Sequence, residues 1–145
     1  MHIILYGVFL FLAVYNAGNM LTLQIQHYGI YPSVGEANFK NYMKANNKSA
    51  MVPSIVPAML LMLVNIILIF SRPAFLPRSI AILTFVLNVI AFISTITWQR
   101  KLQGDMAETG YDEIKILLLI STNWIRTLAF LIQSIIAVAI IMQAV

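Results

Sequence analysis

The sequence predicts an all-α, polytopic membrane protein: an antiparallel four-helix transmembrane bundle with a small cap formed by the first long loop. Composition is the first observation behind this prediction, because the 145 residues are 61% hydrophobic and only 10% charged, unlike a soluble domain. Charge placement is the second, since no Asp, Glu, Lys or Arg occurs in residues 1–35, 49–71, 79–99 or 127–145. Each run can hold a helix of about 20 residues, which crosses about 30 Å of hydrocarbon.

The predicted spans are residues 3–26, 52–70, 80–98 and 116–142. The first lacks a basic N-terminal region and is longer than the apolar core of a signal peptide, so we expect a membrane helix there. Pro53 and Pro57 should start or bend the second span, because proline lacks a backbone donor. The spans fill most of residues 1–145, which we interpret as a single transmembrane domain with no separate soluble catalytic domain.

The connections between the spans predict the topology. Residues 71–78 ("SRPAFLPR") form a tight turn, whereas residues 27–50 and 99–115 are long connections for so small a bundle. Because each span crosses the membrane once, both long connections lie on one face. Both termini and the tight turn then lie on the other face. The long-connection face carries most of the cations: Lys40, Lys44, Lys48, Arg100, Lys101 and Lys115. The positive-inside rule therefore predicts that this face is cytoplasmic.

The fourth span carries an arginine at its entry into the bilayer. Nineteen residues follow Arg126, enough for about 28 Å of helix. The preceding apolar stretch, residues 116–122 ("ILLLIST"), should then project beyond the lipid and pack on protein. We expect residues 27–50 to cover it, because Val34, Phe39 and Tyr42 are spaced as on an amphipathic turn or short helix. The acidic third connection, residues 99–115, is interpreted as a solvated turn followed by a helix start.

Every predicted span has a polar stripe at helical spacing. The stripes are Asn16, Asn19 and His27 with Gln24 and Gln26 beside them; Ser54 and Asn65; Thr84, Asn88, Thr95 and Gln99; and Asn123, Arg126, Thr127 and Ser134. Polar groups that face lipid are costly, so the stripes should face inward. Their richest parts meet at the long-connection end, which predicts a ligand or catalytic site there.

Simpler interpretations stay open for individual residues. Asn65, Thr84 and Ser134 are typical of hydrogen bonds between neighbouring helices. Trp98 and Trp124 are typical of the aromatic belt at a membrane interface, and a lone Arg126 could extend to lipid headgroups. The convergence of Gln24, His27, Gln99, Asn123 and Arg126 at one end is what favours a site.

The residue types also limit the chemistry. There is no cysteine, and His2 and His27 are the only imidazoles, so we expect no metal and no cofactor. The net charge of +4 is spread over short connections, which favours anionic lipid headgroups and not nucleic acid. The expected partners are membrane lipids, an apolar small-molecule ligand or substrate, and a second copy of the chain or another subunit of a membrane complex.

Three stretches carry a resemblance to a known family: "LTLQIQHYGIYPSVGEANFKNY" (21–42), "STITWQRKLQ" (94–103) and "TNWIRT" (122–127). In order and spacing, the chain resembles the anthrone-oxygenase-like family of small four-helix integral membrane proteins. The family's elements at the end of the first helix and the start of the fourth match Gln24, His27, Tyr28, Asn123, Trp124, Arg126 and Thr127. Relatives carry histidines in the regions where this chain has Met43, Asn46 and Gln103, so a histidine-rich metal centre is not expected.

The resemblance implies oxygenation of a polycyclic phenolic ketone without metal or flavin, in the inner membrane of a bacterium. His27 would be the base that removes an acidic proton, and Arg126 and Asn123 would stabilise the resulting oxyanion. Tyr28, Trp98 and Trp124 would stack on a flat ring. Gln24, Gln99, Thr127 and Asn16 complete the predicted substrate-binding set. Two alternatives remain: a protein that binds a quinone, isoprenoid or lipid without turnover, or a small accessory subunit whose polar stripes are assembly contacts.

Overall fold

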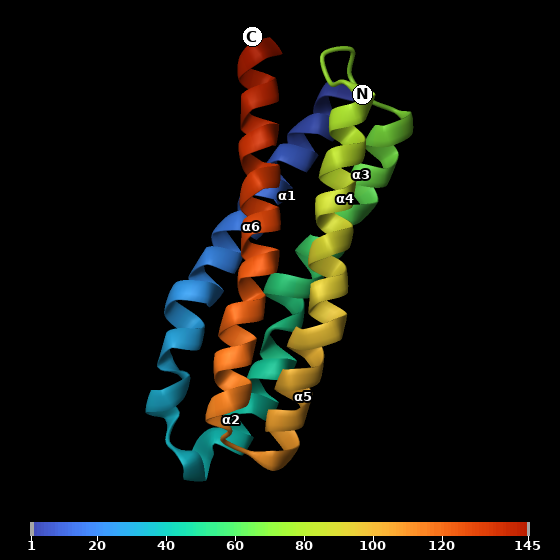
Figure 1. Cartoon of the computed structure of the whole chain (residues 1–145). Helices are drawn as coiled ribbons and strands as arrows, with labels where there is room; N and C mark the ends of the chain where they lie inside the picture. Colours follow the sequence, from blue (N-terminus) through green and yellow to red (C-terminus); the bar gives the residue numbers. More distant parts are fainter. Residues whose placement is uncertain (1, 145) are drawn as a thin grey trace.

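The computed structural model describes residues 2–144 as four long helical segments joined by short connections (Figure 1). The first segment is α1 (His2–Thr22), the π-helical turn η1 (Leu23–His27) and the 3-10 helix η2 (Tyr28–Val34). The second is α2 (Glu36–Ser49), the π-helical turn η3 (Met51–Ile55) and α3 (Val56–Phe70). The third is α4 (Arg78–Ser94), the π-helical turn η4 (Thr95–Gln99) and α5 (Arg100–Thr109), and the fourth is the single helix α6 (Glu113–Ala144).

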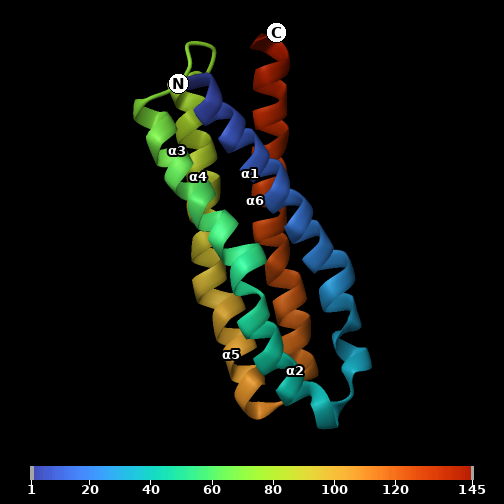
Figure 2. The same ribbon diagram turned by 180° about the vertical axis from the view of Figure 1, so that it is seen from behind.

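The segments run antiparallel, and each contains a helix long and apolar enough to cross a membrane. Both termini lie at one end with the connection between α3 and α4, and α2 and α5 lie at the other end (Figures 1 and 2). No strand occurs among residues 2–144. The prediction of an all-α bundle with four transmembrane helices is confirmed, and the chain is an integral membrane protein.

The third predicted connection is corrected by the structure. Most of residues 99–115 belong to α5, which ends where Gly110 adopts a φ of 95°, a conformation that favours glycine. Leu102 and Met106 are one helical turn apart and both buried, so an apolar stripe keeps this polar stretch helical. The expected helix start is confirmed, because α6 begins at Glu113.

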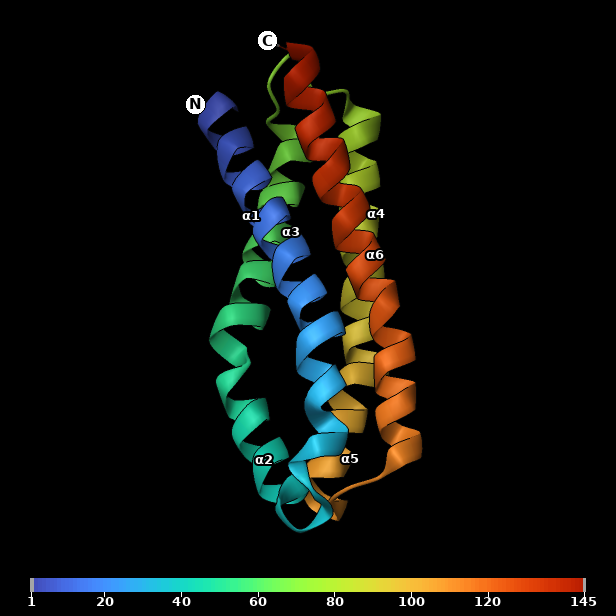
Figure 3. The ribbon, with the colours of Figure 1, turned by 90° about the vertical axis from the view of Figure 1, so that its left-hand side faces the viewer.

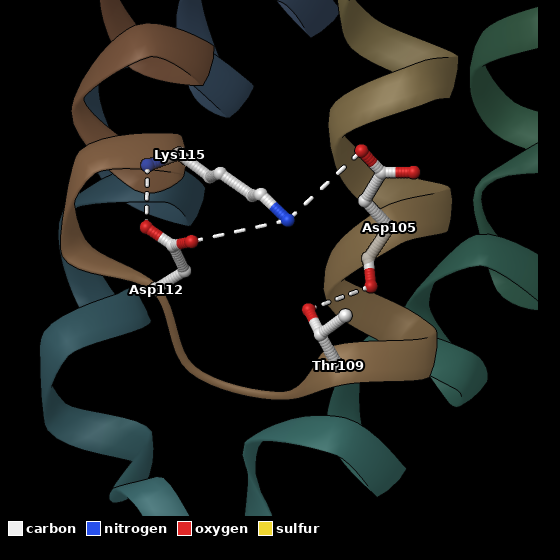
Figure 4. Close-up of polar contacts among 4 residues, drawn as sticks. All are labelled: Asp105, Thr109, Asp112 and Lys115. Carbon is white, nitrogen blue, oxygen red and sulfur yellow. Dashed lines mark hydrogen bonds and ion pairs between the residues drawn. The ribbon is translucent and has the colours of Figure 1, made fainter.

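Two ion pairs lie at the connection between α5 and α6, and one of them joins the two helices (Figure 4). Lys115 Nζ lies 3.8 Å from Asp112 Oδ2 and 4.0 Å from Asp105 Oδ2. The Lys115 backbone N–H also donates to Asp112 Oδ1 at 3.0 Å, and the Thr109 hydroxyl donates to the Asp105 carbonyl at 2.9 Å. Asp105 of α5 therefore pairs with Lys115 of α6 across the connection, whereas the contacts of Asp112 are local to the start of α6.

A second hydrophobic core lies outside the membrane-spanning core and forms the cap. It joins η2, α2, α5 and the first turns of α6 through the buried residues Tyr28, Tyr31, Phe39, Met43, Leu102, Met106, Ala107, Ile116 and Leu119. Phe39 contacts Tyr31 and Tyr111 edge to face, at ring-centroid distances of 5.7 Å and 5.2 Å. The expected cap is therefore present as a packed helix, and it covers the projecting start of α6.

The three π-helical turns lie where the first three segments pass from the membrane bundle into the cap. Pro53 is within η3 and Pro57 is in the first turn of α3, as expected from their missing donors. Figure 3 shows the second segment bending between α2 and α3. Single π turns inside helices are frequent at functional sites, and here η1, η3 and η4 surround the start of a cavity.

Candidate functional site

The guanidinium of Arg126 is the centre of the polar cluster at the cap end of the bundle. Its Nε donates to Asn123 Oδ1 at 2.8 Å, and Nη2 donates to the same oxygen. Nη1 donates to the Thr95 hydroxyl and Nη2 to the Tyr28 hydroxyl, each at 3.3 Å. Arg126 is only 9% exposed, and the ion pairs found in residues 2–144 involve Lys115 and not Arg126. The buried guanidinium is therefore held by neutral oxygens.

A second layer of hydrogen bonds fixes the side chain of Asn123. Asn123 Nδ2 donates to Gln24 Oε1 at 2.7 Å, and Gln24 Nε2 donates to the carbonyl of Ile120 at 3.1 Å. The Thr127 hydroxyl lies 3.3 Å from Asn123 Nδ2 and donates to the Asn123 carbonyl at 3.1 Å. Because Nδ2 is occupied in this way, Oδ1 of Asn123 is aimed at Arg126.

Neither Gln24 nor Gln99 accepts a hydrogen bond from Arg126 directly. Gln24 acts one step away, through Asn123. Gln99 Nε2 donates to the Thr122 hydroxyl at 3.0 Å, while Gln99 Oε1 is buried without a hydrogen-bond partner among residues 2–144. This oxygen remains an acceptor for another molecule.

His27 is held on the other side of Tyr28. Its Nε2 lies 2.9 Å from Asn46 Oδ1 and 3.5 Å from the Tyr31 hydroxyl, and Asn46 Nδ2 donates to that hydroxyl at 3.3 Å. A carbonyl oxygen only accepts, so the contact with Asn46 requires the proton on Nε2. The Nδ1 atom then carries the lone pair, as a general base needs.

A polar cavity of about 240 Å³ begins at this cluster. It lies between η1, η3, η4 and the two cap helices, and it is lined by Leu23, His27, Tyr28, Asn46, Asn47, Ala50, Ser54, Ile55, Thr95, Gln99, Arg100, Gln103, Gly104 and Arg126. An apolar cavity of about 320 Å³ continues into the membrane level, lined by Met20, Ser54, Ile55, Ala58, Met59, Met62, Asn88, Ala91, Phe92, Thr95, Ile96, Arg100, Arg126 and Phe130.

The two cavities share Thr95, Arg100 and Arg126 as well as Ser54 and Ile55. Arg126 therefore lies at the junction between a polar chamber and an apolar one. No Asp or Glu of residues 2–144 lines either chamber, whereas two arginines line both. This arrangement suits an amphipathic ligand whose anionic or strongly accepting oxygen binds at the junction.

The predicted site residues fall into three groups. Four of them, His27, Tyr28, Gln99 and Arg126, line the polar chamber. Gln24, Asn123 and Thr127 lie behind Arg126 and position it. Asn16 is buried but lines neither chamber; its Nδ2 donates to the Leu12 carbonyl at 2.8 Å.

The position of the two tryptophans does not support the predicted stacking role. Trp98 is 37% exposed and Trp124 is 42% exposed, and neither lines a chamber. Trp98 precedes Gln99 in the sequence, and Trp124 follows Asn123. Neighbouring residues on a helix point about 100° apart, so the tryptophan side chains do not share the direction of these site residues. Their outward position is that of aromatic residues at a membrane interface.

Sequence reasoning missed several lining residues, namely Asn46, Asn47, Arg100, Gln103 and Gly104. A signal for Asn46 was present, because Asn46 follows the buried residues Phe39 and Met43 at helical spacing. Gln103 had no such signal, since it was placed in a loop; in the structure its Nε2 donates to the Tyr28 hydroxyl at 3.3 Å.

Among residues 2–144, no three His, Cys, Asp or Glu side chains gather closely enough to hold a metal ion. The polar groups available for chemistry are therefore one imidazole, two guanidinium groups, the tyrosine hydroxyls and several amides. Comparisons with protein-family models, with curated proteins and with solved structures find no match to this chain.

Proposed function

We propose that the chain is a membrane enzyme that binds an apolar ring compound with an acidic oxygen and oxygenates it without a metal or organic cofactor. The oxygen of the substrate binds Arg126 at the junction of the two chambers. The activated CH₂ group lies in the polar chamber, within reach of the base His27, and the outer rings extend into the apolar chamber. The resemblance of "TNWIRT" (122–127) and the stretch 21–42 to the anthrone-oxygenase-like family supports this reaction type and a bacterial inner-membrane location.

The observation that carries the proposal is the buried guanidinium of Arg126, which has no carboxylate partner within residues 2–144. A buried charge is costly unless it is paired and hydrogen-bonded. Arg126 has five N–H donors, and the hydrogen bonds to Asn123, Thr95 and Tyr28 use four of them. One N–H of Nη1 is left for a ligand, and an oxyanion there supplies the missing negative charge.

The reaction balances with dioxygen as the co-reactant. His27 takes a proton from an activated CH₂ group of the substrate, and Arg126 stabilises the resulting enolate oxygen. The carbanion electron pair reduces dioxygen and forms a C–O bond, which gives a hydroperoxide once a proton is returned. Loss of water from the hydroperoxide leaves a ketone, so that CH₂ and O₂ give C=O and H₂O.

The test uses the full chain in lipid nanodiscs with dihydroxyanthrone as the probe. We expect oxygen uptake and formation of the corresponding anthraquinone above the rate of empty nanodiscs. His27→Ala should reduce turnover by about a hundredfold or more while the probe still binds. His2→Ala is the matched control, because His2 lies at the opposite end of the bundle near Ser71.

The outcomes separate this proposal from its alternatives. Binding of the probe with no oxygen uptake by the unmodified chain would indicate a carrier or quinone-binding protein. Absence of binding, together with co-purification of another membrane protein, would favour an accessory subunit. Equal turnover by His27→Ala and His2→Ala would remove His27 from the reaction.

A further inference from the structure

We infer that Asn88 is a specificity-determining residue, which hydrogen-bonds a second, neutral oxygen of the ligand deep in the apolar chamber. This inference rests on the proposed function, because it concerns the far end of the molecule whose acidic oxygen binds Arg126. The ligand class becomes narrower: an elongated apolar molecule with an acidic oxygen at one end and a carbonyl or hydroxyl at the other.

The first observation is the unpaired amide of Asn88. Asn88 is 2% exposed, and its Nδ2 is buried without a hydrogen-bond partner among residues 2–144. A buried amide in an apolar setting destabilises the fold if its hydrogen bonds are not made. Among residues 2–144, the buried amide NH₂ groups without a partner are those of Asn65, Asn88 and Gln133, and of these three residues Asn88 alone lines one of the two chambers. A ligand in that cavity can make the missing hydrogen bond once the Asn88 side chain turns its amide toward the chamber.

The second observation is the distance between the two polar points. Thr95, whose hydroxyl contacts Arg126, lies seven residues after Asn88, which is about 10 Å along the helix. Between them the chamber is apolar, with Ala91, Phe92 and Ile96 on one side and Ala58 and Met62 on the other. The chamber is thus polar at both of these points and apolar between them, which matches a ligand with one oxygen at each end and a hydrocarbon body between the two oxygens.

The route of entry follows from the lining residues. Met59 of α3, Phe92 of α4 and Ile96 of η4 line the apolar chamber and are also exposed on the membrane-facing surface. The chamber therefore opens sideways toward lipid, between the second and third helical segments. A ligand dissolved in the bilayer reaches Asn88 without crossing the cap.

The experiment compares two probes and three variants in nanodiscs, with binding measured under argon by equilibrium dialysis against empty nanodiscs. Hydroxyanthraquinone carries two neutral carbonyl oxygens on its middle ring in addition to the acidic hydroxyl, whereas hydroxyanthracene has the hydroxyl and lacks both carbonyls. The affinity ratio of the two probes is compared between chains, so that differences in acidity and lipid partition between the probes cancel. Asn88→Leu fills the space of the amide and Asn88→Ala leaves it open, and Asn65→Leu is the matched control.

We expect Asn88→Leu and Asn88→Ala to weaken hydroxyanthraquinone binding by about fivefold to tenfold and to leave hydroxyanthracene binding within about twofold. Asn65→Leu should keep the wild-type ratio, because Asn65 accepts from Thr84 at 3.0 Å and lines neither chamber. Two variants of Asn88 are used so that a folding defect in one does not decide the result.

An unchanged probe ratio in both Asn88 variants would overturn this inference while the proposed function stands. A ratio that changes equally in Asn65→Leu would also overturn it, since the effect would then come from the bundle as a whole. If the unmodified chain binds neither probe, the proposed function and this inference both fail.

Discussion

The Tyr28 hydroxyl accepts a hydrogen bond from Arg126 Nη2 at 3.3 Å, although the two residues are 98 positions apart in the sequence. The same hydroxyl accepts from Gln103 Nε2 at 3.3 Å. One oxygen therefore joins η2, α5 and α6 at the boundary between the membrane bundle and the cap. Because its two acceptor positions are used, the Tyr28 O–H proton is free to donate into the polar chamber that Tyr28 lines.

Tyr28→Phe should therefore affect both stability and binding. Two buried donors lose their acceptor, which should lower the free energy of unfolding by about 1–3 kcal/mol. Hydroxyanthraquinone binding should weaken as well, because the donor into the chamber is gone. Thermal unfolding and equilibrium dialysis in nanodiscs measure the two effects.

Tyr15→Phe is the control for this prediction. The Tyr15 hydroxyl donates to the Pro53 carbonyl at 3.0 Å, in an exposed position outside both chambers. A loss of binding in Tyr15→Phe as large as in Tyr28→Phe would mean that the Tyr28 hydroxyl has no special role.

The topology predicts opposite accessibility for the two ends of the bundle. The chain has no cysteine, so Ala45→Cys in α2 and Ala74→Cys in the α3–α4 connection each introduce a single label; both positions are exposed. A membrane-impermeant thiol reagent added to intact cells should label Cys at only one of them. We expect labelling at position 74, because the positive-inside rule places the cap in the cytoplasm. Labelling of both positions from the same side would contradict the four-span topology.

The cap should resist proteolysis in the folded protein. Lys40, Lys44 and Lys48 all lie on the surface of α2, and a protease needs this helix to open locally before it can cleave. Phe39→Ala removes a side chain that is 0% exposed at the centre of the cap core, which should cost about 3–5 kcal/mol. Trypsin should then cleave α2 much faster, as followed by mass spectrometry.

Phe11→Ala is the matched control for Phe39→Ala, because Phe11 is a large exposed residue of α1 in the membrane-spanning part. Its cleavage rate in α2 should equal that of the unmodified chain. Rapid cleavage of the unmodified chain at all three lysines would show that the cap is not packed in solution.

The sequence predicted the features that depend on composition and period. Apolar runs of membrane length predicted the spans, and the stripe of Phe39 and Tyr42 predicted a cap. The helix ends were less predictable, because Gly104 and the charged residues around it form a pattern that is typical of a turn. In the structure this stretch is helical, since Leu102 and Met106 of α5 are buried against α2. That burial depends on contacts between distant segments, which local patterns do not encode.

The same limit applies to the site. Helical spacing predicted that the side chains of Gln24, His27, Asn123 and Arg126 meet at one end of the bundle. It did not predict which of them form hydrogen bonds with one another. A π turn holds one residue more than an α turn, so η1 and η4 change which side chains face inward beyond Thr22 and Ser94. This shift contributes to the outward position of Trp98, which lies in η4.

The last prediction concerns the shape of the charge at position 126. Arg126→Lys keeps a positive charge and a long side chain, so a role limited to electrostatic attraction would survive the change. An ammonium group is compact, however, and cannot donate to Asn123, Thr95 and Tyr28 from a planar fork as the guanidinium does. We expect Arg126→Lys to fold, to lose at least tenfold in affinity for hydroxyanthraquinone, and to lose turnover of dihydroxyanthrone. Arg78→Lys, at an exposed position at the opposite end of the bundle, should change neither quantity. If Arg126→Lys binds the probe as tightly as the unmodified chain, the guanidinium serves only the packing of helices, and the ligand oxygen must bind elsewhere in the chambers.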